Sequence, residues 1–147
     1  MTGWRLGVAV GNRNIIAALG SVKSNYDTGI FLTVQRAGVA ALRGDQDSLA
    51  EYRNRFQRRR DVFVDGLNRI GFSIRKPQAT FYVWARIPGS ESSREFCARL
   101  LEETGVVVTP GAGFGRYGEG YFRAAMTVDE ARLAEAVRRI GTILRGM

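Results

Sequence analysis

The sequence predicts an α+β fold in which helices pack against one small mixed sheet. From residue 47 the hydrophobic periodicity alternates between helical and strand spacing, in the order helix, strand, strand, helix, strand, strand, helix. Residues 1–44 show one strand and two helices without partner strands, which indicates the end of a larger domain. The 147 residues are 45% hydrophobic and 24% charged, enough to bury a core without disulfides. We therefore expect two parts, 1–44 and 45–147.

The first part begins with the apolar run 6–10, which predicts a buried strand. Asn12 can cap a helix over 13–25, because its side chain can accept the unpaired N–H groups at a helix start. A turn cluster at 24–29 leads to a second helix over 31–42, which a glycine stops. The apolar positions of the first helix share one face: Ile15, Ile16, Leu19 and Val22.

The second part opens with the longest element, a helix over 47–70 that Gly71 closes. Ser92 or Ser93 can cap a helix that ends at Gly105, and Asp129 opens the final helix. Alternating and β-rich runs between the helices predict four strands. These are 72–74, 79–87, 106–109 and 121–126.

The net charge of +8 raises the question of a nucleic-acid partner. The positive charge comes from 20 Arg and two Lys, set against 14 acidic residues. The arginine-rich helix is nearly neutral, because almost as many acidic as basic residues lie within 45–70. Glu51–Arg55 and Asp65–Arg69 are i,i+4 pairs on it. A nucleic-acid site needs clustered positive charge, usually with aromatic platforms. A basic nucleic-acid binder is therefore the weakest alternative, and we expect no such partner.

The residue types exclude several chemistries. The chain has no histidine and a single cysteine, Cys97, so Ser-His-Asp and Cys-His catalysis and histidine-ligated metal sites are excluded. We expect no metal. Cys97 lies among apolar residues of a predicted helix, which favours a core position over a nucleophile. The sequence shows neither a leader pattern nor a run of about 18 apolar residues, so we expect a cytoplasmic protein without a membrane partner.

Five glycines within ten residues mark the segment 111–120. Residues 113–118 match G-x-G-x-x-G, but the dinucleotide interpretation requires a helix after the motif, and here a strand follows. No Gly-Lys-Ser/Thr follows either, which excludes a P-loop. Two interpretations stay open: a flexible connection between strands, or a loop that brings its backbone close to a ligand.

Two arginines lie beside or within apolar strands. Arg5 precedes the run 6–10, and Arg123 interrupts the run 121–126. Each points to solvent or is held by an anion, because a buried unpaired charge is very costly. The planar guanidinium suits bidentate binding of carboxylate or phosphate. Taken alone, each is more often a solvent-facing residue.

Together, several segments resemble the class I/II aminotransferases, the fold-type I enzymes that use pyridoxal phosphate, and among them the LL-diaminopimelate and aspartate/alanine aminotransferase groups. The resemblance covers the whole chain in order. It implies that 1–44 is a strand–helix–helix remnant of the large cofactor-binding domain and that 45–147 is the C-terminal small domain. The segments that carry it are Met1–Gly7, Ala79–Trp84, Val107–Gly111, Phe114–Gly115 and Gly118–Arg123.

The resemblance also implies roles for individual residues. Arg5 would bind the phosphate of the cofactor, and Arg123 would bind the α-carboxylate of the substrate. Phe81 would line the substrate pocket, and Asn25 would face the site of the neighbouring subunit in a homo-oligomer, as in a dimer. The activity implied is transfer of an amino group between an amino acid and a 2-oxo acid.

In the family, the Schiff-base lysine and the other cofactor ligands precede the Met-Thr-Gly-Trp-Arg segment with which this chain begins. The two lysines present, Lys23 and Lys76, fall at predicted surface positions. Because that lysine is essential to the chemistry, we expect this chain alone to hold no catalytic residue, to be inactive, and to bind pyridoxal phosphate weakly or not at all. The alternative is a non-catalytic module that folds, or oligomerises through surface the large domain would cover.

Overall fold

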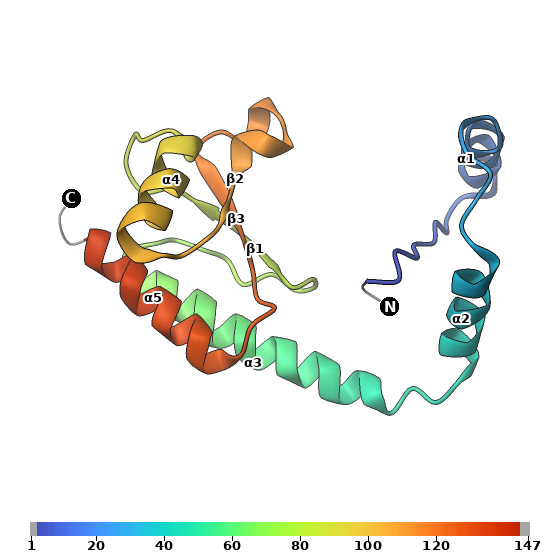
Figure 1. Ribbon diagram of the computed structural model, residues 1–147, viewed down its shortest axis with the longest axis horizontal. Coiled ribbons are helices and arrows are strands. Elements are labelled where there is room, and N and C mark those ends of the chain that lie inside the picture. The colour runs from blue at the N-terminus through green and yellow to red at the C-terminus, as the bar shows by residue number, and fades with distance from the viewer. Residues whose placement is uncertain (1–2, 145–147) are drawn as a thin grey trace. The chain divides into compact units, whose positions relative to one another are not determined.

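The computed structural model describes residues 3–144 and divides into two compact units, with the boundary between Ser48 and Leu49 (Figure 1). The first unit contains two helices, α1 (Arg13–Tyr26) and α2 (Leu32–Arg43), close to the predicted ranges. The side chain of Asn12 accepts a backbone N–H two residues later at 2.9 Å, which confirms the predicted cap.

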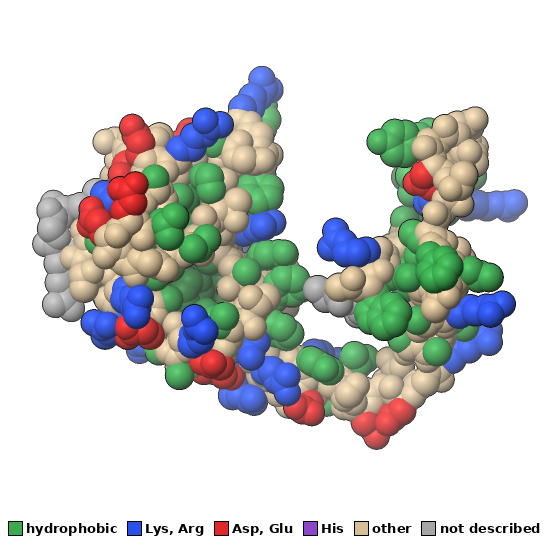
Figure 2. Space-filling view, in the orientation of Figure 1, with side chains coloured by type: hydrophobic (Ala, Val, Ile, Leu, Met, Phe, Trp, Pro, Cys, Tyr) green, Lys and Arg blue, Asp and Glu red, His purple; other side chains and the backbone are tan. Residues whose placement is uncertain are grey.

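The first unit buries little apolar surface of its own. No residue of α1 is buried, and on its predicted apolar face Ile15 and Val22 are 68% and 67% exposed. Figure 2 shows hydrophobic side chains on the surface of this unit. In α2 the buried residue is Gly38, because the side chain of Leu6 lies where a Cβ would stand. The amphipathic pattern thus predicted the helices correctly, but no other layer of this unit covers their apolar faces among the described residues.

The strand predicted over 6–10 is wrong. These residues adopt no regular structure, and Val8 and Val10 are largely exposed. A strand needs a neighbour that takes up its backbone hydrogen bonds, and the described part of this unit contains no strand to pair with it. An apolar run can predict an extended segment, but a strand also requires a neighbouring strand to pair with.

The second unit has the predicted α+β organisation, with one small sheet and three helices. Gly66 of α3 lies against Val137 of α5, and these helices run side by side in Figure 1. Two short 3₁₀ turns, η1 (Gly111–Phe114) and η2 (Arg116–Gly118), fold the glycine-rich loop. The helices and strands are α3 (Ser48–Arg69), β1 (Tyr82–Arg86), α4 (Ser93–Thr104), β2 (Thr109–Pro110), β3 (Tyr121–Ala125) and α5 (Glu130–Leu144).

The sheet has the strand order β1-β3-β2, with β3 in the centre. Arg123 of β3 stands opposite Trp84 of β1 on one side and Thr109 of β2 on the other. Both pairings are antiparallel, so among the described residues the sheet is wholly antiparallel rather than mixed as expected. The α+β fold class itself is confirmed.

The two faces of the sheet differ sharply. Alternate residues of β1 and β3, including Val83 and Phe122, are fully buried against the helices. Phe96 of α4 stacks on Phe122 at 5.6 Å between ring centres, and Leu67 of α3 belongs to the same core. The period-2 alternation therefore directs the remaining side chains, Arg123 among them, to the opposite face.

Two of the predicted strands are not formed as expected. Phe72 and Ile74 are buried, but the backbone N–H and C=O of Ile74 bond to the side chain of Asn68 at 2.8 and 3.0 Å. That amide takes the place of a neighbouring strand. Of the run 106–109, only Thr109 enters a strand ladder.

The helix signals of this unit are largely confirmed. Ser92 forms a capping box at the start of α4, and Gly105 ends that helix with φ +68°. Glu51 and Arg55 pair at 2.6 Å as predicted. Asp65 pairs with Lys76 at 2.8 Å, whereas an i,i+4 pair with Arg69 was expected. The compact charge of Lys76 reaches Asp65 from the loop after α3.

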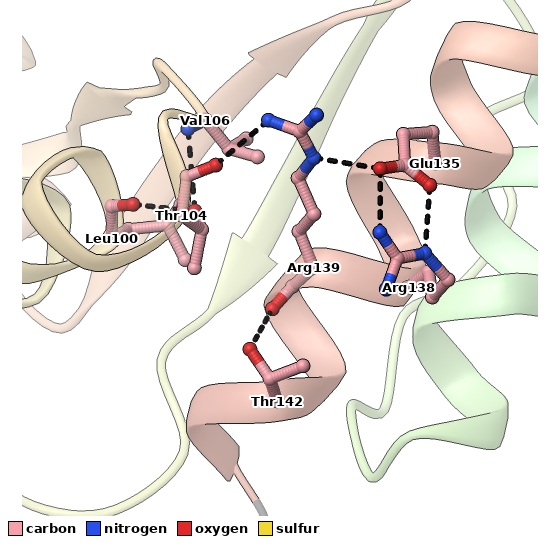
Figure 3. Close-up of polar contacts among 7 residues, drawn as sticks. All are labelled: Leu100, Thr104, Val106, Glu135, Arg138, Arg139 and Thr142. Atoms are coloured by element: carbon pink, nitrogen blue, oxygen red, sulfur yellow. Dashed lines mark hydrogen bonds and ion pairs between the residues drawn. The ribbon is translucent and has the colours of Figure 1, made fainter.

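A charged network joins α5 to the end of α4 (Figure 3). Glu135 accepts hydrogen bonds from Arg138 and Arg139 at 2.6–2.8 Å, and Arg139 also donates to the backbone oxygen of Thr104 at 3.2 Å. These bonds hold the pKa of Glu135 far below its usual range, at about 2. Within residues 3–144, no helix is both long and apolar enough to cross a membrane.

Candidate functional site

The outer face of the sheet carries one arginine between aromatic rings. The guanidinium carbon of Arg123 lies 4.2 Å from the ring centre of Tyr82 and 4.5 Å from that of Phe114. Tyr82 comes from the neighbouring strand β1, and Phe114 comes from the glycine-rich loop. Both distances are within the range of cation–π attraction, so the two rings hold the planar group.

Two further rings extend this surface. Trp84, opposite Arg123 in the ladder, meets Phe114 edge to face at 5.6 Å and stacks on Tyr121 at 5.7 Å. We call Tyr82, Trp84, Phe114 and Tyr121 the aromatic frame. Because aromatic pairs of this geometry attract one another, the frame braces the ring of Phe114 over the arginine.

The charge of Arg123 has no acidic counterpart. Its side chain is half-buried, and within residues 3–144 no carboxylate pairs with it. A partly desolvated cation without a counter-ion is unfavourable until an anion arrives. The flat fork of nitrogens matches a carboxylate in two parallel hydrogen bonds. The geometry therefore suits capture of a carboxylate at this face of the sheet.

The glycine-rich loop is tightly folded. The backbones of Gly111 and Gly118 pack directly on each other, with no room for a Cβ at either position. Gly115 has φ +109° and Gly120 has φ +77°, values that favour glycine. The folded loop carries Phe114 to the arginine, so the glycines help to build the site.

Glu119 ties this loop to the start of α4. Its carboxylate accepts the backbone N–H of Ser93 at 2.7 Å and the hydroxyl of Ser93 at 3.0 Å. The backbone N–H of Gly120 donates to the same carboxylate at 3.1 Å. These donors hold the pKa of Glu119 below its usual range, with the Ser93 N–H as the largest cause. A negative group here also suits the positive end of the helix dipole.

Arg5 lies in the first unit, in a turn where its own φ is +55° and that of Gly3 is +89°. Its side chain is exposed and makes no hydrogen bond or ion pair within the part of the chain that the structure describes. A guanidinium with all its donors available fits a phosphate chemically. Arg5 and Arg123 belong to different units.

Phe81 and Asn25 also fall in different units. Phe81 directly precedes β1, with ring centres 4.4 Å from Tyr82 and 5.9 Å from Phe56 of α3. It lines a groove of about 460 Å³ between α3 and the segment 77–81. Asn25 is exposed near the end of α1, where its side-chain amide donates to a backbone oxygen at 2.8 Å.

The nucleophile-type side chains stand apart from this surface. Lys76 pairs with Asp61 and Asp65, and Lys23 pairs with Asp27. Cys97 is buried, and burial raises the pKa of its thiol to about 11, as expected of a core residue. Within residues 3–144, no group of His, Cys, Asp or Glu could hold a metal ion.

Sequence reasoning assigned no role in the site to the four residues of the aromatic frame or to Glu119. The alternation of β1 carried a signal for Tyr82, since it shares a face with the position opposite Arg123. Phe114 and Glu119 lie in segments that carried the resemblance, but no local signal gave either one a role in the site. Their places depend on how the glycine-rich loop folds back on the sheet and on α4.

The family model for aminotransferase class I and II matches residues 1–140. The chain is 54% identical to an LL-diaminopimelate aminotransferase from Nitratidesulfovibrio vulgaris over 143 residues, and 51% identical to one from Moorella thermoacetica over 144 residues. These alignments cover 97% and 98% of this chain but 37% of each relative. The chain thus spans little more than a third of the length of these relatives.

A solved aminotransferase structure is also similar to this chain in fold. The aromatic aminotransferase from Pyrococcus horikoshii superposes with a TM-score of 0.83 at 32% sequence identity. That superposition covers 99% of this chain and 40% of the solved chain.

Proposed function

Because the chain belongs to the class I and II aminotransferase family, we propose that it forms the carboxylate-binding side of a pyridoxal-phosphate-dependent aminotransferase site. The reaction is transfer of an amino group between an amino acid and a 2-oxo acid, and the whole enzyme is a homo-oligomer. Residues 45–147 are the small domain, and residues 1–44 are the end of the large domain. The unit boundary after Ser48 supports a division in this region.

The observation that carries the proposal is the guanidinium of Arg123, which contacts the rings of Tyr82 and Phe114 and pairs with no carboxylate among residues 3–144. Arg123 binds the α-carboxylate of the substrate through two parallel hydrogen bonds. The two rings that contact the guanidinium restrict its plane, and so orient the rest of the substrate. Because Arg123 is half-buried, the local dielectric is lower than in water, which strengthens the attraction between its guanidinium and the substrate carboxylate.

Arg5 holds the phosphate of the cofactor in this proposal, since its donors are not used elsewhere among the described residues. When bound, pyridoxal phosphate supplies the electron sink that stabilises negative charge at the substrate Cα. The lysine for this chemistry is neither Lys23 nor Lys76, because both are ion-paired to carboxylates. The isolated 147 residues are therefore inactive and bind the cofactor weakly or not at all.

The names of the relatives suggest the substrate. At 51–54% identity to LL-diaminopimelate aminotransferases, we take LL-diaminopimelate as the amino acid of the complete enzyme. Phe81 lines its pocket beside the aromatic frame, in keeping with its contact with Tyr82. Asn25 faces the site of the neighbouring subunit and contributes to the choice of substrate side chain.

A chimaera tests the proposal. The part of the Nitratidesulfovibrio vulgaris relative that precedes its matched segment is joined to this chain, and activity is measured with LL-diaminopimelate and 2-oxoglutarate. Arg123→Lys should raise the KM for the amino acid about 30- to 140-fold, the equivalent of about 2–3 kcal/mol for a charged hydrogen bond. Arg116→Lys is the matched control, because Arg116 lies in the glycine-rich loop that leads into the strand of Arg123 and stacks on Tyr117 instead.

Unchanged kinetic constants in Arg123→Lys would reject the assignment. A chimaera that fails to fold is recognised by its circular dichroism and is replaced by the corresponding join to the Moorella thermoacetica relative. The proposal also fails if the folded chimaera accepts no amino acid as donor.

A second candidate function has its own observation. Apolar side chains stand exposed in the first unit, among them Phe31 at 74% and Leu42 at 77%. Such surface favours self-association of a non-catalytic module. Sedimentation of the 147-residue chain tests this second function. A molecular mass that stays that of a monomer at all concentrations rejects the self-associating module.

A further inference from the structure

We propose that Glu119 is a positioning residue for Arg123: its carboxylate fastens the glycine-rich loop to α4 and thereby keeps the ring of Phe114 on the guanidinium. The inference rests on the proposed carboxylate-binding role of Arg123. Glu119 itself touches neither substrate nor cofactor in this proposal.

The first link joins Glu119 to α4. One carboxylate oxygen accepts the backbone N–H of Ser93 at 2.7 Å, and the other accepts its hydroxyl at 3.0 Å. Ser93 is the first residue of α4 and is completely buried. Both oxygens are therefore directed to one rigid residue, and charge-assisted bonds of this kind are the stronger class.

The second link joins Ser93 to the turn that carries Phe114. The backbone N–H of Ala112 donates to the Ser93 hydroxyl at 3.3 Å. Ala112 and Phe114 both lie in η1, and the packing of Gly111 on Gly118 closes the loop behind them. A shift of the Glu119–Ser93 contact thus moves the turn from which the ring projects.

The third link is the ring itself. Phe114 is 50% exposed, and its aromatic contacts are with Trp84 and Arg123, at 5.6 Å and 4.5 Å. A half-exposed ring is not held in place by core packing. Its position over the guanidinium depends on the backbone beneath it as well as on its edge-to-face contact with Trp84, and Glu119 fixes that backbone.

Glu95 provides a matched comparison. It lies in the first turn of the same helix and bonds to Ser92 in the capping box, at 2.5 and 3.2 Å. Like Glu119, it places one negative charge at the start of α4. Its hydrogen bonds engage Ser92 and do not reach the glycine-rich loop. Replacing Glu95 therefore removes a cap and a charge while leaving the link to Phe114 intact.

The test uses NMR of the 147-residue chain labelled with ¹⁵N. The Nε–Hε signal of Arg123 is identified by its loss in Arg123→Lys, and its shift reports the rings beside it. Wild type, Glu119→Gln and Glu95→Gln are each titrated with 2-oxoglutarate as the carboxylate probe. Ser93→Ala serves as a second variant, because it removes the hydroxyl between Glu119 and Ala112 without changing charge.

Glu119→Gln and Ser93→Ala should each move the Arg123 signal toward the position of an exposed arginine. Each should also lower the affinity for 2-oxoglutarate at least threefold. Their double variant should shift the signal no further than either alone, since both break one chain of contacts. Glu95→Gln should lower the thermal midpoint but leave the signal and the affinity within 1.5-fold of wild type.

The inference is overturned if Glu119→Gln and Glu95→Gln give the same Arg123 signal and affinity in folded protein. Failure of the proposed function looks different. In that case 2-oxoglutarate leaves the Arg123 signal of the wild type unmoved, while the signal still responds to Glu119→Gln. Should Glu119→Gln not fold, Ser93→Ala alone decides by the same two readouts.

Discussion

The guanidinium of Arg123 lies 4.5 Å from the ring centre of Phe114, a residue of the loop that leads into the same strand. Between Phe114 and Arg123 the chain passes through Gly115 and Gly120, whose positive φ angles allow it to turn back. A cation in a central strand is thereby covered by the segment that precedes it.

Removal of this ring should loosen the arginine. Phe114→Ala deletes one of the two cation–π contacts, worth about 0.5–1 kcal/mol at an exposed site. We expect two- to fivefold weaker binding of 2-oxoglutarate to the 147-residue chain, measured by titration of the Arg123 signal. Tyr117→Ala is the control, since its ring lies on Arg116 at 4.6 Å and should leave the affinity unchanged. Equal affinities for all three proteins would contradict the role of the ring.

The contact between Gly111 and Gly118 predicts a position-specific loss of stability. Gly118→Ala places a Cβ against the backbone of Gly111, which must move away. Overpacking of this kind costs about 1–3 kcal/mol, seen as a lower midpoint of urea unfolding. Gly113→Ala, in the same loop, meets open space and should change stability by much less. A similar loss in both variants would show that the loop is not closed by this contact.

The sequence predicted the outer face of the sheet better than the loop above it. The apolar run 121–126 predicted a strand that contains Arg123, whereas the register that sets Trp84 opposite it comes from the structure. Phe114 and Glu119 could not be found this way, because their positions follow from the fold of a glycine-rich loop. The strand over 6–10 was predicted from an apolar run, but the described residues of its unit offer no partner strand.

The charged network on α5 predicts how stability depends on acid. The pKa of Glu135 is held at about 2, below the ordinary 4.5, by Arg138 first and Arg139 second. A carboxylate with a lowered pKa stabilises the fold fully above its unfolded pKa, and this contribution is lost as pH falls from about 4.5 toward 2.

Glu135→Gln should therefore unfold more easily than wild type at pH 6, and the difference should shrink on acidification to pH 2.5. The measurement is the urea midpoint across this range. Glu102→Gln on α4 is the control, because Glu102 is exposed and has no ion pair within the part of the chain that the structure describes. A difference that stays constant or grows toward low pH would contradict the network.

Burial of Cys97 predicts slow alkylation. With its thiol pKa raised to about 11 and its side chain in the core, the reactive thiolate is scarce at pH 8. Iodoacetamide should modify the folded chain far more slowly than the chain in urea, as followed by mass spectrometry. Equal rates would show that α4 opens readily or does not pack as described.

The central claim is that Arg123 binds the carboxylate of the substrate. A double-mutant-type cycle, which removes the guanidinium and the α-carboxylate separately and together, tests it most directly. The chimaera and its Arg123→Gln variant are assayed with 2-oxoglutarate and with the corresponding aldehyde, which lacks the α-carboxylate. Wild type should prefer the 2-oxo acid, and Arg123→Gln should reduce that preference in kcat/KM about 30- to 140-fold, a coupling of about 2–3 kcal/mol. An equal preference for the 2-oxo acid in both proteins would contradict the account.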